Sequence, residues 1–400
     1  MRVAIVSRIF PPEPAAASFR LSALADALKD AGHDVTVLTV KPPKWLEATV
    51  KSGRPKYDVR RFPVVRDKSG YVRGYVPYLS FDVPLFFRLL LGRQYDLIVS
   101  EPPPTTGFFV RLATMLRRMP YAYYAADIWS EASTQTTAPG WMVNAVRWIE
   151  RFAMKGARVA LSVSDDVTTR IAAMGVTRAT TVGNGGDIEI FRSALAQAHG
   201  RDHRVAVPTF VYAGTASEWH GAEVFVDAMP ELLAAVPTAR LRFIGGGSER
   251  DALKQRADDL GVRTSVTFED AMAPALLAPI LHGATAAVAS VRPGSSYEFA
   301  FPTKLYSAIA CGAPIIYSGR GPTSDFVETL IDGLPIGACV DADRHHLAQT
   351  MIRYSAETNS DARRDAVSKW AEQNVSLRAV SKRAVRRLEE ALRVDGKDQI

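Results

Sequence analysis

The segment 298–312 gathers residue types that could act on a phosphorylated substrate. Glu298 is followed by Pro302 and Lys304, and the pattern from Lys304 onward predicts a short helix that Gly312 ends. The first N–H groups of that helix and the Lys304 ammonium would point at one spot, which is a natural seat for phosphate. The alternative is that a helix started by Pro and ended by Gly only separates a loop from a strand. These residues alone leave the two interpretations evenly balanced.

Apolar strands alternate with amphipathic helices along the whole chain, which is the pattern of doubly wound parallel sheets. The rhythm is lost over 192–208, where we place a linker, and it then starts again. We therefore predict an α/β protein with two domains of similar size and a ligand cleft between their carboxyl edges. The domains span 1–195 and 205–375, and 376–400 forms a C-terminal helix that can pack back on the N-terminal domain.

Composition narrows the class of protein. With 47% apolar and 23% charged residues, the chain resembles a soluble globular protein. Its two cysteines, Cys311 and Cys339, lie far apart without other metal ligands, which argues against a zinc site or a disulfide framework and suits a reducing cytoplasm. The sequence has no apolar run of spanning length and no recognisable signal peptide. We expect a cytoplasmic protein, with the inner face of the cell membrane as one place of action.

Positive charge is concentrated in the segment 51–93, which has ten Lys and Arg residues against three Asp. Within it, 79–91 is a very apolar helical stretch. This combination suggests an anionic partner, such as a lipid surface or a phosphorylated substrate. A solvated loop face explains the charge equally well. Nucleic acid is the least favoured partner, because the segment contains no known recognition module.

Glycines at the ends of predicted strands indicate a phosphate-binding site, as the 298–312 segment does. Gly214 and the glycines 245–247 follow two predicted strands, where they let the backbone approach a phosphate closely. The chain has no Gly-x-Gly-x-x-Gly after its first strand and no Gly-Lys-Ser/Thr. These absences argue against nicotinamide dehydrogenases and P-loop nucleotidases.

Six motifs follow one another along the chain. They are Phe10-Pro-Pro-Glu-Pro-Ala-Ala-Ala-Ser-Phe-Arg20, Asp127-Ile-Trp-Ser-Glu131, Val182-Gly-Asn-Gly-Gly-Asp187, Phe210-Val-Tyr-Ala-Gly214, Phe243-Ile-Gly-Gly-Gly247 and Pro302-Thr-Lys-Leu-Tyr306. In this order they resemble the family 4 retaining glycosyltransferases, in particular the branch that includes bacterial O-antigen and capsule enzymes. The resemblance covers nearly the whole chain, and its specificity lies in the order of the motifs rather than in any one of them.

The resemblance implies a GT-B fold, in which two doubly wound Rossmann-like domains face each other across a cleft. It implies that the N-terminal domain, 1–195, binds the acceptor and that the C-terminal domain, 205–375, binds the nucleotide-sugar donor. It also implies transfer of a sugar from a nucleoside diphosphate sugar, with UDP favoured, to a lipid-linked or polysaccharide-precursor acceptor. In such enzymes basic side chains and helix N-termini stabilise the leaving diphosphate. Neither a metal nor a cofactor is therefore expected.

The resemblance also implies roles for individual residues. The catalytic residues are Asp127, Glu298 and Lys304. The donor-binding residues are Ala16, Ala17, Gly214, Thr215, His220, Gly245, Phe268, Pro302, Thr303 and Ser307. The acceptor-binding residues are Arg20, Trp129 and Asn184.

Each of these roles has a structural alternative. Phe268 is better explained as a core residue. Asp127 follows a strand and could instead cap the next helix. Arg20 could be a solvated helix residue, and Lys304 an ordinary surface lysine.

The chain departs from the family pattern at the donor site. Ser307 stands where the family's second acid is expected. Glu298 lies nine residues before Ser307, which is one residue more than the family spacing. A serine holds a ribose hydroxyl more weakly than a carboxylate does. The Arg and Lys that usually follow the strand ending at Gly214 are missing, and His220 is the nearest basic substitute.

The first loop departs as well, because the alanines 15–17 replace paired glycines. Two alternatives to the leading interpretation therefore stay open. The chain could be a GT-B tailoring enzyme that glycosylates a soluble natural product or metabolite. It could also be a degenerate, non-catalytic GT-B protein that binds a partner.

Overall fold

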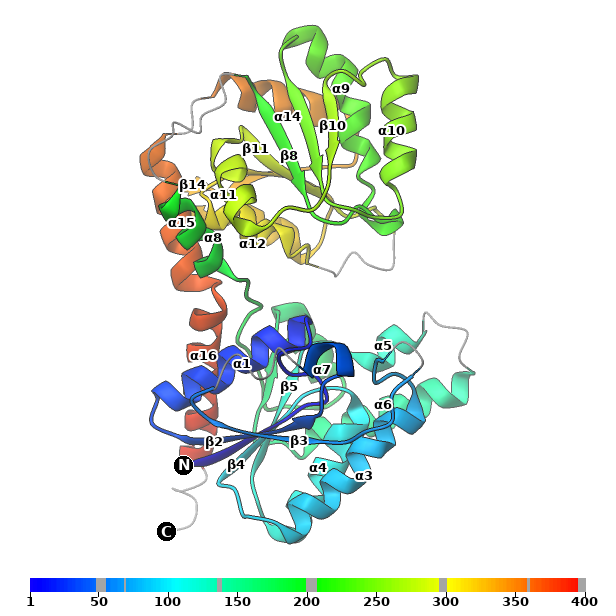
Figure 1. Ribbon diagram of the computed structural model, residues 1–400, viewed down its shortest axis with the longest axis vertical. Coiled ribbons are helices and arrows are strands. Elements are labelled where there is room, and N and C mark those ends of the chain that lie inside the picture. Colours follow the sequence, from blue (N-terminus) through cyan, green and yellow to red (C-terminus); the bar gives the residue numbers. More distant parts are fainter. Residues whose placement is uncertain are drawn as a thin grey trace. The chain divides into compact units, whose positions relative to one another are not determined.

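A computed structural model describes residues 1–47, 55–67, 70–134, 139–198, 207–294, 301–357 and 360–394 (Figure 1). The chain forms two compact units. The first contains Met1–Gly185 together with the segment from Leu377 onward, and the second contains Gly186–Ser376. Within the described ranges we find no helix with the length and hydropathy needed to cross a membrane.

The first unit is built on a seven-stranded parallel sheet in the order β3-β2-β1-β4-β5-β6-β7. Its strands are β1 (Arg2–Val6), β2 (Asp34–Val40), β3 (Asp58–Phe62), β4 (Leu97–Ser100), β5 (Tyr121–Ala125), β6 (Ala160–Ser162) and β7 (Ala179–Thr181). Its α-helices are α1 (Ala16–Asp30), α3 (Tyr75–Leu91), α4 (Pro104–Arg117), α5 (Trp129–Thr134), α6 (Gly140–Lys155), α7 (Asp165–Ala173) and α16 (Leu377–Val394).

Two helical layers cover the first sheet. One layer contains α3, α4 and α6, whose buried residues Phe81, Val110 and Ala153 share a core with β5. The other contains α1 and α16, whose buried residues Leu24 and Leu388 share a second core. The C-terminal helix thus belongs to the first unit, and Arg383 Nε of α16 donates to the Val182 carbonyl at 2.9 Å.

The second unit has a six-stranded parallel sheet in the order β10-β9-β8-β11-β12-β15. Its strands are β8 (Thr209–Ala213), β9 (Arg240–Ile244), β10 (Val266–Glu269), β11 (Ala286–Ser290), β12 (Ile315–Ser318) and β15 (Gly337–Val340), and β13 (Leu330–Ile331) and β14 (Leu334–Pro335) form a separate small ribbon. Its α-helices are α8 (Ile188–Gln197), α9 (Glu223–Ala235), α10 (Arg250–Asp259), α11 (Pro274–Gly283), α12 (Lys304–Ala310), α13 (Pro322–Val327), α14 (Arg344–Ala356) and α15 (Asp361–Asn374).

In each sheet the order in which successive strands are added reverses beside the first strand, between β1 and β4 in the first sheet and between β8 and β11 in the second. In open parallel sheets, ligands bind at the carboxyl edge beside such a reversal. The two units are therefore Rossmann-like α/β domains, as the alternation of elements predicts.

The domain boundary differs from the predicted one. Residues 192–197 were expected to belong to a linker, but they form the second half of α8, which packs on α11 in the second unit. The polar residues that break the apolar rhythm there lie on a partly exposed helix surface. β15 is an edge strand of the second sheet and was not among the features predicted from the sequence.

Candidate functional site

The strongest candidate site lies at the carboxyl edge of the second sheet, beside the neighbouring strands β8 and β11. Gly214 and Thr215 follow β8, and the glycines 245–247 follow β9. Lys304 is the first residue of α12, the helix that comes after β11. The parallel strands thus bring three predicted donor-binding segments to one edge.

Lys304 is held directly over the end of β8. Its Nζ donates to the Tyr212 hydroxyl and, at 3.1 Å, to the Thr215 carbonyl. The same Nζ lies 3.7 Å from the centre of the Tyr212 ring. No carboxylate in the described part of the chain forms an ion pair with this ammonium. Lys304 is therefore a positioned cation whose partners are neutral.

Burial lowers the pKa of Lys304 to about 7. An anion that entered the site would stabilise the charged ammonium and raise this pKa again. A surface lysine at the start of a helix would have no reason for such a shift. The environment of Lys304 thus favours a phosphate-binding role over the alternative that its helix only separates a loop from a strand.

Glycine is required where the loops after β8 and β9 touch. A Cβ atom on Gly245 would lie 2.4 Å from the Gly214 carbonyl oxygen, and one on Gly247 would lie 1.9 Å from the Ala216 carbonyl oxygen. Gly214 has φ +140° and faces the Lys304 side chain, since a Cβ there would lie 3.3 Å from Lys304 Cε. These glycines allow the two loops and the lysine to occupy one small volume.

His220 does not replace the missing basic residues. It is buried, its Nδ1 accepts a hydrogen bond from the Ser217 N–H at 3.0 Å, and its ring stacks on Trp219. Burial and the nearby Lys304 charge lower its pKa to about 4. His220 is therefore neutral near pH 7 and holds the β8–α9 loop, so the expectation of a basic substitute is wrong.

Ser307 lies one turn after Lys304 on the same face of α12. Its hydroxyl donates to the Lys304 carbonyl at 2.8 Å, which leaves only its acceptor capacity for a ligand. Pro302 and Thr303 form the turn before the helix, where the Leu305 N–H donates to the Pro302 carbonyl. Glu298 lies outside the described residues, so its predicted role stays a prediction.

Phe268 packs into the sheet core, as its structural alternative predicts. Its ring stacks on Phe243 with centroids 5.1 Å apart and an interplanar angle of 5°. The two residues are register partners on β10 and β9. Phe268 thus extends the core at the sheet edge.

In the first unit, Asp127 is exposed just beyond the carboxyl end of β5. Neighbouring protein atoms displace part of the water around the Asp127 carboxyl group, which raises its pKa, and the Arg20 charge opposes that rise. Another carboxylate takes the first N–H groups of the next helix. The N–H groups of Trp129 and Ser130 donate instead to Glu150 of α6, at 2.8 and 3.0 Å. The Asp127 carboxylate thus remains at the edge where a ligand is expected.

Arg20 is neither solvated nor aimed at open space. It is buried, and its guanidinium forms an ion pair with Glu101, which follows β4 and is also buried. The guanidinium carbon lies 5.4 Å from the centre of the Tyr124 ring. Arg20 is therefore paired with Glu101, and its charge also lies near Asp127.

The other predicted residues of the first unit are spread along the same sheet edge. Ala16 and Ala17 form the first turn of α1, where Ala15 offers no side-chain cap. Trp129 starts α5 and contacts Tyr78 edge to face. The Asn184 side chain accepts a hydrogen bond from the Gly185 N–H at 3.0 Å.

The motifs do not single out Glu101, Tyr212 and Arg8. Glu101 is an acid directly after an apolar strand, and Asp127 likewise lies just beyond a strand. Tyr212 looked like a core residue because it lies within a buried strand. Arg8 is buried after β1 with its guanidinium carbon 3.6 Å from the Tyr78 ring centre, and its Nε and Nη1 have no acceptor among the described residues.

The fold is that of a GT-B glycosyltransferase, and comparison with known proteins agrees. A "Glycosyl transferase 4-like domain" model matches residues 16–185, and a "Glycosyl transferases group 1" model matches residues 207–357. The chain belongs to the family 4 type of GT-B glycosyltransferases.

Known relatives and structures extend this comparison. The chain is 26% identical to a GDP-mannose-dependent alpha-(1-6)-phosphatidylinositol monomannoside mannosyltransferase of Mycobacterium tuberculosis, over 88% of this chain and 89% of that protein. It is 31% identical to a D-inositol 3-phosphate glycosyltransferase of Rhodococcus opacus, over 39% and 37% of the two chains. The Anabaena HepE structure with UDP-glucose has a TM-score of 0.63 at 15% identity, covering 98% of this chain and all of HepE.

Proposed function

We propose that the chain transfers a sugar from a nucleoside diphosphate sugar to a lipid-linked or polysaccharide-precursor acceptor, with retention at the anomeric carbon. The observation that carries this proposal is the Lys304 ammonium, held by Tyr212 and Thr215 with no carboxylate partner among the described residues. As the bond between the anomeric carbon and the diphosphate breaks, its electron pair stays on the diphosphate. Lys304 balances that charge without a metal ion.

The proposed roles divide between the two units. Gly214 and Thr215 bring the backbone close to the diphosphate, and the acceptor capacity of Ser307 serves a donor hydroxyl. Asp127 contacts the transferred sugar or the acceptor from the first unit. Glu298 contacts the hydroxyls of the transferred sugar.

The nucleotide is the least constrained part of the proposal. UDP was favoured from the sequence, whereas the mycobacterial relative is named for GDP-mannose. GDP-mannose is therefore the first donor to test and UDP-glucose the second. Mass spectrometry of acceptors incubated with each donor tests the proposal, and transfer that persists in EDTA supports metal independence. A chain that transfers sugar from no donor would favour the non-catalytic alternative.

A lipid acceptor is supported by the exposed surface of α3. Val76, Leu79, Val83, Phe87 and Leu91 are all exposed, and their spacing of three or four residues places them in one stripe along the helix. Five large apolar side chains in contact with water mark a surface that has a partner. We propose that this stripe contacts the inner face of the cell membrane. The named substrate of the mycobacterial relative is a lipid, which is consistent with this proposal.

Replacing Leu79 and Phe87 by serine is expected to lower binding to phosphatidylcholine vesicles about tenfold or more, because each change removes apolar area from the contact. Vesicle flotation measures the effect. The matched control is Leu276→Ser with Leu334→Ser, two exposed leucines of the second unit. Equal losses in both pairs, or no loss in either, would remove the α3 contact.

A soluble acceptor is the second candidate, since the Rhodococcus relative is named for D-inositol 3-phosphate. In that case the chain would glycosylate a phosphorylated metabolite without vesicles or detergent. Transfer to soluble acceptors that is unaffected by the serine variants of α3 would favour this candidate.

Diphosphate binding is expected to take up nearly one proton at pH 8. The free Lys304 has a pKa of about 7 and is mostly neutral at that pH, whereas the bound anion restores its charge. Affinity should therefore fall as pH rises above 7. Calorimetry of UDP and GDP in two buffers with different ionisation enthalpies measures the uptake. At pH 6 the uptake should be small, because Lys304 is already charged.

The same titration of Lys304→Met provides the control. Residual binding without proton uptake in the variant would support Lys304 as the titrating group. Equal uptake in the wild type and the variant would assign the proton to another group.

A further inference from the structure

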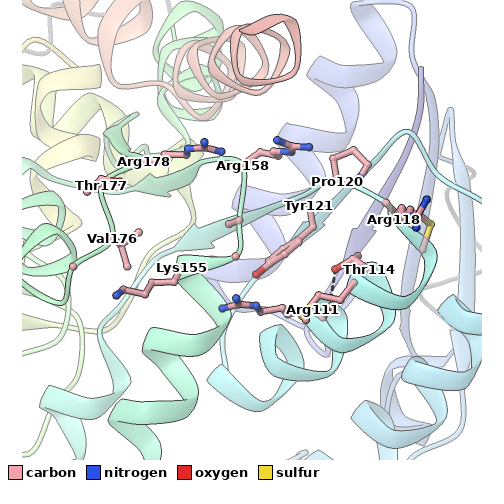
Figure 2. Close-up of a pocket in the computed structure, with 15 residues that line it drawn as sticks. Arg111, Thr114, Arg118, Pro120, Tyr121, Lys155, Arg158, Val176, Thr177 and Arg178 are labelled. Carbon is pink, nitrogen blue, oxygen red and sulfur yellow. Dashed lines mark hydrogen bonds between the residues drawn. The ribbon is translucent and has the colours of Figure 1, made fainter. Parts of the chain in front are cut away.

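A cavity of about 620 Å³ lies in the first unit at the edge of the sheet opposite to Asp127. The carboxyl ends of α4, α6 and α7 surround it, together with the residues that precede β5, β6 and β7 (Figure 2). Neither the proposed donor site nor the α3 stripe uses these residues. We call it the basic cavity.

Five of the fifteen residues that line the basic cavity are cationic and none of the fifteen is acidic. The cations are Arg111, Arg118, Lys155, Arg158 and Arg178. Cations near helix ends also complement the helix dipoles, which is the simplest reason for some of them. Three helix ends supply only about −1.5 charges in total, however, so the dipoles alone do not offset the cations of the lining. The lining therefore suits a ligand with more than one negative charge.

The cavity is built around Arg111. Its guanidinium lies 4.0 Å from the Phe152 ring centre and donates to the Phe152 carbonyl, while its Nε has no acceptor among the described residues. A Cβ on Gly156 would lie 2.5 Å from that Nε, so glycine leaves the room that the guanidinium occupies. Gly175 similarly adjoins the end of the Lys155 side chain. Two of the cations are thus placed by packing.

Apolar side chains border the same opening. Met115 lines the cavity and is 60% exposed, and the adjacent Leu116 is 66% exposed. Both lie in the last turn of α4, which packs beside α3 in one helical layer. Cations beside exposed apolar residues match a lipid surface, where phosphate groups lie just above the acyl chains. A soluble phosphate would give no role to Met115 and Leu116.

We infer that the basic cavity binds the phosphate groups of anionic lipids at a membrane surface. This inference rests on the proposed membrane contact of α3 and adds a headgroup preference to it. The α3 stripe is apolar and binds neutral and anionic membranes alike. The basic cavity makes binding depend on anionic lipid and on salt.

The test compares flotation with vesicles of phosphatidylcholine alone and of phosphatidylcholine mixed with phosphatidylglycerol. The wild type is expected to prefer the mixed vesicles, and added salt should weaken that preference. The Lys155→Ala, Arg178→Ala double variant should lose roughly 30-fold in binding to mixed vesicles, at about fivefold for each cation. Its binding to neutral vesicles should stay unchanged. The thermal unfolding midpoint of the variant checks its fold.

The matched control is Arg344→Ala with Lys369→Ala, which removes two exposed cations from the second unit. A wild type without preference for phosphatidylglycerol, or equal losses in both double variants, would overturn the inference. Saturable binding of inorganic pyrophosphate that needs Lys155 and Arg178, without any vesicle preference, would also overturn it and assign the cavity to a soluble ligand.

Failure of this inference is separable from failure of the proposed function. Sugar transfer without a preference for phosphatidylglycerol would remove only the basic cavity. A charge-dependent preference in a chain that transfers no sugar from any donor would remove only the proposed activity.

Discussion

Lys304→Met is expected to lower the rate of sugar transfer about 10²- to 10³-fold, the range found when one preorganised electrostatic contact to a developing charge is removed. Methionine keeps the length of the side chain but cannot balance charge on the diphosphate. The effect should appear in kcat as well as in kcat/KM, because that charge develops as the sugar leaves. Initial rates of transfer, measured with the donor that mass spectrometry identifies, determine the size of this effect.

The same variant is expected to be more stable than the wild type. The pKa of Lys304 is about 7 in the folded protein, below its ordinary value of 10.5, so the unfolded chain binds more protons between these values. The cost of burying the ammonium is complete below pH 7 and declines as pH rises toward 10.5. Lys304→Met should therefore gain about 1–3 kcal/mol at pH 6 and less at pH 9. Denaturant unfolding at the two pH values measures the difference.

Opposite effects on rate and stability distinguish a functional lysine from a structural one. Lys304→Arg is the matched variant, because it keeps a permanent positive charge and should retain more activity than the methionine variant. A loss of stability in Lys304→Met together with unchanged turnover would show that Lys304 only supports the fold.

Glu101→Ala is expected to destabilise the first unit by about 3–5 kcal/mol, because it leaves Arg20 buried without its negative partner. Hydrogen exchange of β4 and β5 amides measures this effect within the first unit. The second unit should keep its exchange rates, since its core is separate.

The double variant Arg20→Met, Glu101→Leu is the control for that prediction. Replacing both charges by apolar side chains removes the unpaired ion and should restore most of the lost stability. A double variant as unstable as Glu101→Ala would show that packing at Glu101, rather than the unpaired Arg20 charge, causes the loss.

The sequence was informative wherever a local signal coincided with the fold. Pro302 and Gly312 mark the limits of α12, and Gly312 adopts φ +70° as a helix-ending glycine should. The apolar run at the N-terminus is a strand buried in a parallel sheet. These features depend on neighbouring residues alone, so one sequence is enough to predict them.

Other features depend on contacts between distant residues. Nothing near His220 in the sequence indicates that burial and Lys304 keep it neutral. The Glu150 carboxylate accepts from the first N–H groups of α5 but belongs to a different helix, α6. The sequence around α5 therefore offered only Asp127 as a capping residue. The Tyr212 hydroxyl accepts a hydrogen bond from Lys304, although the position of Tyr212 in an apolar strand predicts only a core residue.

The central claim is that a nucleoside diphosphate binds at Lys304, and calorimetric titration tests it most directly. Wild type and Lys304→Met are each titrated with UDP and with GDP at pH 7. We predict that at least one nucleotide binds the wild type and binds the methionine variant about tenfold or more weakly, as expected when a charge-assisted contact is lost. Absence of binding to the wild type, or equal affinity in the two proteins, would contradict the claim.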